Sequence, residues 1–85
     1  MDKTWSVEIA GKKHQIDFDF GRNNSRTGKL VVDGDEVQTW KNSQWLDVPK
    51  EIAFQVGGKP AVLREKGLFT ARINLYFEGK LVKPA

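Results

Sequence analysis

The sequence predicts an all-β fold, a single-domain antiparallel β-sandwich of about eight short strands in four hairpins. Two observations predict it. Apolar and polar residues alternate along most of the chain with the two-residue period of half-buried strands. Turn signals that contain glycine interrupt this alternation at intervals of about 8–12 residues, as they do in antiparallel sandwiches and barrels. Because the chain has 85 residues, we expect residues 1–85 to form one domain.

The first predicted hairpin has the clearest alternation. The apolar positions of its first strand are Trp5, Val7 and Ile9. Residues 10–12, Ala-Gly-Lys, then predict a turn. The apolar face of its second strand carries His14, Ile16, Phe18 and Phe20. We therefore expect one buried face on this hairpin, with His14 as a core or rim histidine that has one hydrogen-bond partner.

The second predicted hairpin turns at Asp33-Gly34. Aspartate and glycine tolerate the positive φ values of a type I′ turn, so this pair between apolar segments is a strong hairpin signal. Leu30–Val32 precede the turn, and Val37 and Thr39 continue the alternation after it. If Val37 and Thr39 face the core, Trp40 faces outward.

The second half of the chain predicts two more hairpins. The apolar positions ahead of a Gly57-Gly58 turn are Ile52, Phe54 and Val56. After that turn, Pro60 indicates a strand start or an edge strand that continues through Val62–Arg64. The last hairpin turns at Glu78-Gly79 before Leu81-Val82. Its apolar positions are Phe69, Ala71, Ile73, Leu75 and Phe77.

Composition excludes several kinds of chemistry. The chain has no cysteine and one histidine, which rules out disulfides, cysteine-ligated metals, a thiol nucleophile and a multi-histidine metal site. Its net charge of +3 is mildly basic. No apolar segment is long enough for a secretory signal or a membrane span. We therefore expect a globular cytoplasmic protein without a membrane segment.

Candidate catalytic and metal-binding residues lack the partners that such chemistry needs. Three serines lie outside any Gly-x-Ser-x-Gly motif, namely Ser6, Ser25 and Ser43. Asp17 and Asp19 share the polar face of one strand, but calcium requires about six to eight oxygen ligands. The acidic segment Asp33–Glu36 is explained more simply by a hairpin turn followed by a solvated strand start than by part of a calcium-binding loop. We expect no catalytic site, no metal and no cofactor.

Two segments without a strand pattern, Gly21–Thr27 and Lys41–Val48, are the candidates for function, because binding residues concentrate on loops. The candidate contact residues in and beside these segments are Arg22, Arg26, Lys29, Trp40 and Trp45. The three cations form the densest acid-free basic group in the chain and would attract an acidic partner. Tryptophan is among the commonest anchor residues of protein interfaces. We therefore expect a protein partner that one tryptophan anchors.

The alternative function is binding of a small ligand, either single-stranded nucleic acid or carbohydrate, through exposed tryptophan and the basic loop. Most aromatic residues lie in core register, and acidic residues interrupt the positive surface, which argues against nucleic acid. A further alternative for Trp40 and Trp45 is that they fold back and cover an open end of the sandwich.

Several segments resemble the Fas apoptosis inhibitory molecule (FAIM) family. They are Trp5–Ile9, His14–Gly21, Thr27–Lys29 and Val31–Gly34, and less closely Phe54–Gly57, Phe69 and Ile73–Lys80. The resemblance implies a compact antiparallel β-sandwich without enzymatic activity, in which Trp5, Ile16 and Phe18 are core residues. It also implies that Gly28 and Asp33-Gly34 lie in turns. The animal proteins of this family have two related β-domains, and this chain is long enough for one.

The FAIM resemblance implies a role in protein contacts. The animal proteins restrain death-receptor signalling and are associated with protection against stress-induced aggregation. We therefore expect a non-catalytic, cytoplasmic protein that binds a protein partner or an aggregation-prone client. Exposed edge strands make a monomer or a weak dimer the expected oligomeric state.

Overall fold

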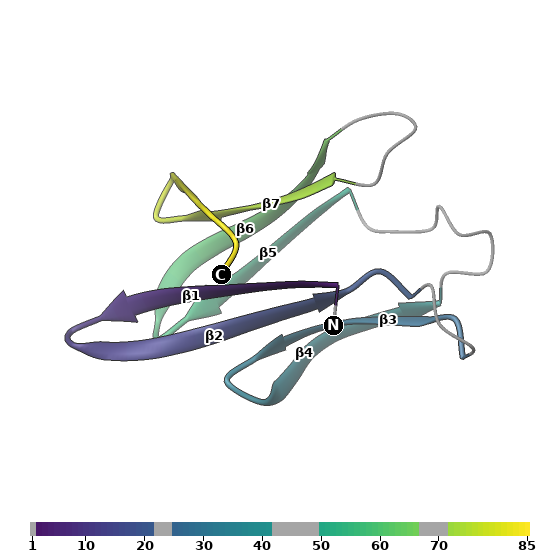
Figure 1. The fold of residues 1–85 in the computed structure, drawn as a ribbon, viewed down its shortest axis with the longest axis horizontal. Coiled ribbons are helices and arrows are strands. Elements are labelled where there is room, and N and C mark those ends of the chain that lie inside the picture. The colour runs from purple at the N-terminus through teal and green to yellow at the C-terminus, as the bar shows by residue number, and fades with distance from the viewer. Residues whose placement is uncertain (1, 22–24, 42–49, 67–71) are drawn as a thin grey trace.

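The computed structural model describes residues 2–21, 25–41, 50–66 and 72–85, and these residues form two antiparallel sheets of four strands each. Sheet A has the strand order β1-β2-β3-β4 and sheet B the order β5-β6-β7-β8. The first four strands are β1 (Lys3–Ile9), β2 (Lys12–Asp19), β3 (Thr27–Val32) and β4 (Asp35–Lys41). The others are β5 (Glu51–Val56), β6 (Lys59–Lys66), β7 (Arg72–Phe77) and β8 (Lys80–Val82). The sheets lie face to face (Figure 1), which confirms the predicted all-β sandwich in four hairpins.

Each hairpin closes with a two-residue turn whose second residue is glycine. The four pairs are Ala10-Gly11, Asp33-Gly34, Gly57-Gly58 and Glu78-Gly79. All eight residues have φ values between 51° and 85°, and type I′ turns require positive φ at both central positions. This turn twists in the same sense as the strands that it joins, so it fixes each strand pair in register. The predicted turn at Asp33-Gly34 is confirmed.

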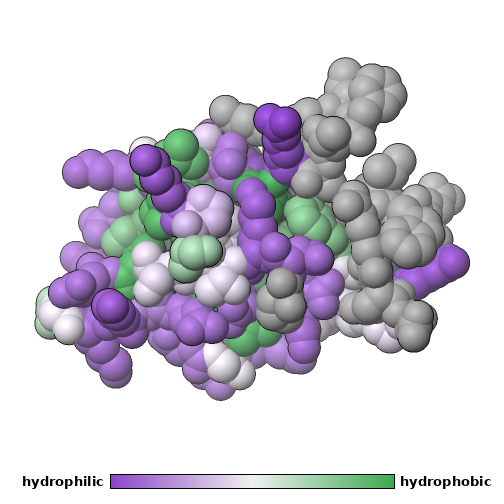
Figure 2. Space-filling view, viewed as in Figure 1, coloured by the Kyte–Doolittle hydropathy of each residue, from purple (hydrophilic) through white to green (hydrophobic). Residues whose placement is uncertain are grey.

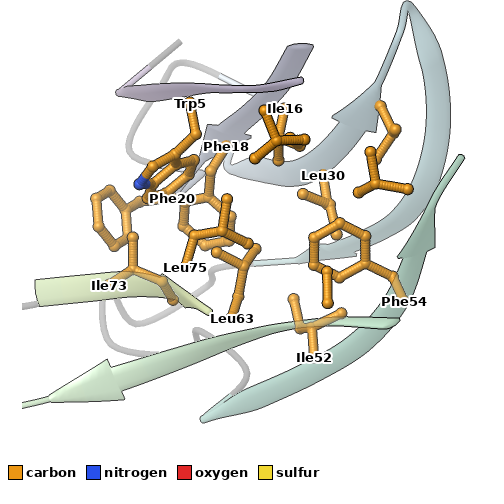
Figure 3. Close-up of a cluster of buried hydrophobic side chains, with 14 residues drawn as sticks. Trp5, Ile16, Phe18, Phe20, Leu30, Ile52, Phe54, Leu63, Ile73 and Leu75 are labelled. Carbon is orange, nitrogen blue, oxygen red and sulfur yellow. The ribbon is translucent and has the colours of Figure 1, made fainter. Parts of the chain in front are cut away.

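The core lies between the two sheets and consists of the inward-facing alternate residues of the strands. Figure 3 shows that side chains of sheet A, such as Trp5 and Phe18, point toward side chains of sheet B, such as Leu63 and Leu75. These four side chains are fully buried. The Phe18 and Phe20 rings meet edge to face with their centroids 5.0 Å apart. Each large apolar side chain buried in this way contributes about 1.5–3 kcal/mol, so the alternating pattern accounts for the assembly of the two sheets.

Contacts near the chain termini join the sheets along one side. The backbone N–H of Ala85 donates a hydrogen bond to the carbonyl oxygen of Thr4 on β1, at 2.8 Å. The Lys3 ammonium donates to the carbonyl oxygen of Ile73 on β7, at 2.9 Å. Figure 1 shows the C-terminus beside β1. The outer edge of β1 is therefore partly covered, whereas β4 and β5 form the sheet edges on the other side.

Strand β4 differs from the prediction because it contains a β-bulge. Leu30 pairs with Gln38 and Val31 pairs with Glu36, so Val37 has no partner in β3. An extra residue reverses the faces of all residues that follow it. Val37 is 47% exposed and Thr39 is exposed, whereas Trp40 packs against the core. The prediction that Val37 and Thr39 face the core and Trp40 faces outward is wrong for this reason.

Candidate functional site

Trp40, a predicted contact residue, is part of the packing of sheet A. Its ring lies 5.3 Å from the Phe18 ring, centroid to centroid, at an interplanar angle of 34°. Gly28 lies opposite Trp40 in the β3–β4 pairing. A Cβ atom on Gly28 would be only 2.3 Å from Cε2 of the indole, so the missing side chain makes room for this ring. The implied turn position of Gly28 is wrong, because Gly28 lies within β3 and serves close packing.

Of the other predicted contact residues, the structure describes Arg26 and Lys29, and Lys29 does not lie on the same face as Trp40. Arg22 and Trp45 lie outside the described residues. Arg26 is exposed just before β3, with a φ value of 53°. Lys29 lies on the outer face of sheet A, and its ammonium is 4.0 Å from a carboxylate oxygen of Glu36. Because successive residues of a strand point to opposite faces, Lys29 and the indole opposite Gly28 lie on different faces of sheet A.

His14 is a hydrogen-bonded rim residue, as predicted. Its side chain is 12% exposed, and Nδ1 lies 2.6 Å from Oδ2 of Asp33 in the β3–β4 turn. An ionised carboxylate only accepts, so the imidazole Nδ1–H donates. The second carboxylate oxygen of Asp33 accepts from the backbone N–H of Gln15, at 2.9 Å. These two donors, together with the charge of Lys12, hold the pKa of Asp33 below its ordinary value, and they tie the turn to β2.

Three of the acidic residues considered as metal ligands, Asp17, Asp19 and Asp33, accept hydrogen bonds from nearby residues. Asp17 accepts hydrogen bonds from the Thr4 hydroxyl, at 2.8 Å, and from the Gln15 amide. The carboxylate of Asp33 accepts hydrogen bonds from the His14 imidazole and the Gln15 backbone N–H. Among the residues that the structure describes, no group of three or more histidine, aspartate or glutamate side chains is placed to hold a metal ion.

The outer face of sheet B carries an apolar row that crosses all four strands, and we call it the outer row. It consists of Ala53, Val62, Tyr76 and Leu81, each directly opposite the next in the strand pairing. Leu81 is 60% exposed, the largest value for a large apolar side chain in the described ranges. In Figure 2, separate hydrophobic side chains are visible among hydrophilic ones in the part of the view where Figure 1 draws β6, β7 and β8.

A hollow of about 250 Å³ opens on the outer row. It is lined by Pro60, Val62, Arg64, Tyr76 and Gly79. The guanidinium carbon of Arg64 lies 5.7 Å from the centroid of the Tyr76 ring, within range for a cation–π interaction. Arg64 Nε is 3.4 Å from a carboxylate oxygen of Glu51, and both side chains are 55% exposed. The hollow therefore combines an apolar floor with one solvent-accessible cation at its rim.

The outer row is not apparent from the sequence alone. The sequence places Val62, Tyr76 and Leu81 on the polar sides of three separate strands, where each is an isolated apolar residue. The row forms only through the registers of the β6–β7 and β7–β8 pairs. The Glu78-Gly79 turn does predict one pair of the outer row from the sequence, because a two-residue hairpin places Tyr76 opposite Leu81.

The fold defines the class of the protein as an all-β sandwich of two antiparallel four-stranded sheets. No protein-family model matches the chain, and a comparison with curated proteins found no match. Membership of the FAIM family stays a prediction. Over the parts of the chain that the structure describes, no helix is long and apolar enough to cross a membrane.

Proposed function

We propose that this protein is a non-catalytic β-sandwich that acts through contacts with other proteins, and that the outer face of sheet B is its contact surface. The observation that carries the proposal is the outer row, whose member Leu81 is 60% exposed beside the hollow at Tyr76. Contiguous apolar surface costs free energy in water, and a partner that covers it recovers this free energy. The outer face of sheet A instead carries polar residues such as Thr4 and Asp17, which bond to each other.

The chemistry of this surface fits an apolar segment that carries carboxylates. A hollow of about 250 Å³ is smaller than the roughly 300–1,000 Å³ of small-molecule pockets, so it suits one side chain of a partner. Arg64 is more than half exposed, and its ion pair with Glu51 contributes little in water. Arg64 is therefore able to exchange Glu51 for a carboxylate of the partner, to which guanidinium binds in a bidentate manner. Arg72, also exposed on β7, adds positive charge.

The proposal includes an aggregation-prone client as one such partner. An unfolding protein exposes apolar segments interspersed with charges, and the outer row offers such a segment an apolar surface. The resemblance to the FAIM family supports this form of the proposal, as it supports a cytoplasmic, non-catalytic role.

Binding of nucleic acid or carbohydrate has less support. Stacking on bases or sugars needs an exposed aromatic face. The Trp40 ring is instead packed against Phe18 and over Gly28, and it lies on the opposite face of sheet A from Lys29. Among the residues that the structure describes, one arginine lies at the rim of the hollow at Tyr76, whereas nucleic-acid sites contact several phosphates.

The experiment measures binding of a fluorescein-labelled peptide that alternates leucine and glutamate, by fluorescence anisotropy. We expect wild-type protein to bind with a Kd of about 10⁻⁶–10⁻⁴ M. Leu81→Ser should weaken binding by at least about tenfold, because it removes the most exposed apolar contact. Val37→Ser is the matched control, since Val37 is also an exposed aliphatic residue but lies on sheet A.

Two results would contradict the proposal. The first is equal affinity of wild type and Leu81→Ser for the peptide. The second is equal affinity for a peptide in which lysine replaces glutamate, because Arg64 should repel it. For the client form, wild-type protein should slow the aggregation of reduced insulin measured by light scattering, and Leu81→Ser should not.

A further inference from the structure

The two sheets have four edge strands, and three of them carry features that prevent pairing with another strand. The edge of β1 is partly covered by Ala85, whose N–H binds the carbonyl oxygen of Thr4. Strand β4 has the bulge at Val37 and acidic residues at its start. Strand β8 has only three residues and is followed by Lys83-Pro84. Bulges, charges, prolines and short strands are the usual protections of sheet edges.

Strand β5 has the weakest protection of the four in the part of the chain that the structure describes: its one charged residue is Glu51 at its start, and Pro49-Lys50 precede it in the sequence. It is six residues long, without a bulge, proline or lysine, and it pairs only with β6. Its buried face packs into the core, and its outer face carries Glu51, Ala53 and Gln55. An edge of this kind is a template for another strand.

The hydrogen-bonding groups that face the free edge of β5 follow from the turn at Gly57-Gly58. A two-residue hairpin makes the flanking pair, Val56 and Lys59, a hydrogen-bonded pair, and every second residue of β5 then bonds to β6. The hydrogen bond from the N–H of Glu65 to the carbonyl oxygen of Lys50 agrees with this alternation, because Lys50 is one of the alternate residues that bond to β6. The N–H and C=O groups of the three outer-face residues of β5 therefore point away from β6, toward the free edge.

We propose that two copies of this chain associate through β5, antiparallel and about a twofold axis at Ala53, so that their two B sheets become one continuous sheet. In this register Ala53 lies opposite Ala53 of the second copy, and Glu51 lies opposite Gln55. All three free-edge residues of each copy then form hydrogen-bonded pairs, and each pair exchanges two bonds. Shifting the register by two residues in either direction loses one of these pairs.

The side chains fit this register. No like charges face each other, because Glu51 meets the neutral Gln55 and can accept a hydrogen bond from its amide. Small Ala53 side chains meet at the axis without a clash. The same register joins the outer rows of the two copies, since Ala53 is the first residue of each row. The contact is formed by one short strand per copy, so we expect a weak dimer rather than an obligate one.

Sedimentation velocity over a range from about 10 μM to about 1 mM tests the proposal on the full chain. Wild-type protein should shift from monomer to dimer over this range. Ala53→Lys places two positive charges opposite each other at the axis and should raise the dimer Kd by at least about tenfold. Ser6→Lys is the matched control, because Ser6 is exposed on β1 and the substitution adds the same charge at another sheet edge. It should leave the dimer Kd unchanged.

A charge pair tests the register itself. Ala53→Lys and Ala53→Glu should each be monomeric alone, and an equimolar mixture should form a heterodimer, because opposite charges then meet at the axis. In hydrogen exchange, the amides of Glu51, Ala53 and Gln55 should gain protection as the wild-type concentration rises. A wild-type chain that stays monomeric at about 1 mM would overturn the proposal. Equal weakening by Ser6→Lys, or failure of the mixture to associate, would also overturn it.

This inference concerns the β5 end of the outer row, whereas Leu81 and the hollow at Tyr76 lie toward its β8 end. Leu81 lies on β8, at the opposite edge of sheet B from β5. Leu81→Ser should therefore weaken binding of the leucine–glutamate peptide and leave the dimer intact, so the two proposals can fail separately.

Discussion

The indole ring of Trp40 lies over Gly28, and a Cβ atom on that glycine would be 2.3 Å from both Cε2 and Nε1 of the ring. The two residues are direct partners in the β3–β4 pairing, and the bulge at Val37 sets this register. Trp40 also contacts Phe18, whose side chain is fully buried. The glycine therefore allows the edge strand β4 to place a large aromatic side chain on the core.

Gly28→Ala should destabilise the fold. The added methyl group cannot fit beneath the indole, so Trp40 has to move off Phe18, and we expect a loss of about 1–3 kcal/mol in unfolding free energy. Urea unfolding followed by circular dichroism measures this loss. In combination with Trp40→Leu, the same change should cost less, because the two residues are coupled. A Gly28→Ala protein as stable as wild type would show that the ring does not occupy this position.

Trp40→Ala should act on stability rather than on binding. Removing a partly buried aromatic residue that packs on Phe18 should cost about 2–4 kcal/mol. Affinity for the leucine–glutamate peptide, measured under conditions where the variant is folded, should stay within about twofold of wild type. Val37→Ala, on the exposed bulge, should change stability by less than about 0.5 kcal/mol. If folded Trp40→Ala lost peptide binding, Trp40 would be a contact residue after all.

Asp33 should give the protein part of its sensitivity to acid. Its pKa lies below the ordinary value of 3.8, because His14 and the backbone N–H of Gln15 donate hydrogen bonds to its carboxylate. A carboxyl group whose pKa is lower in the folded state stabilises the protein above its unfolded-state pKa. That contribution is lost as the pH falls through the folded-state pKa. We therefore expect the free energy of unfolding to decrease as the pH drops below about 4. Asp33→Asn should make this decrease smaller.

Urea midpoints measured at about pH 6 and about pH 3 test the role of Asp33. His14→Gln, which replaces the imidazole donor, should also lessen the difference between the two midpoints. If Asp33→Asn shows the same difference as wild type, the acid sensitivity arises from other carboxyl groups.

Lys29→Gln should have little effect. Its ion pair with Glu36 spans 4.0 Å between exposed side chains, and pairs of this kind contribute less than about 1 kcal/mol. Lys29 lies on the outer face of sheet A, so affinity for the leucine–glutamate peptide should also be unchanged. Arg64→Gln, at the rim of the hollow on sheet B, should weaken the same binding by about fivefold or more. If Lys29→Gln weakened peptide binding more than Arg64→Gln, the contact surface would lie on sheet A instead.

Most of the fold was predictable because local signals agree with the final structure. Asp33-Gly34 and the other glycine pairs are suited to the positive φ values of their turns, and the alternation around Phe18 matches a strand with one buried face. The face of Trp40 was not predictable in the same way. Its orientation depends on the bulge at Val37, and the alternation in sequence continues through this residue without interruption.

The candidate surface was less predictable than the fold. Contact residues were expected on loops, and two of them, Arg22 and Trp45, lie outside the described residues. The outer row instead consists of strand residues whose proximity depends on pairing between strands that the sequence does not specify. Tyr76 and Leu81 each look like an ordinary isolated apolar residue until the register joins them.

The most direct test of the contact surface is a two-dimensional ¹H–¹⁵N NMR titration of the folded protein with the leucine–glutamate peptide. We predict that the largest shift changes fall on the amides of Val62, Tyr76 and Leu81, around the hollow on sheet B. The indole N–H of Trp40 and the amide of Lys29 should stay in place. Shift changes concentrated at Trp40 and Lys29, with Tyr76 and Leu81 unaffected, would contradict the proposed surface.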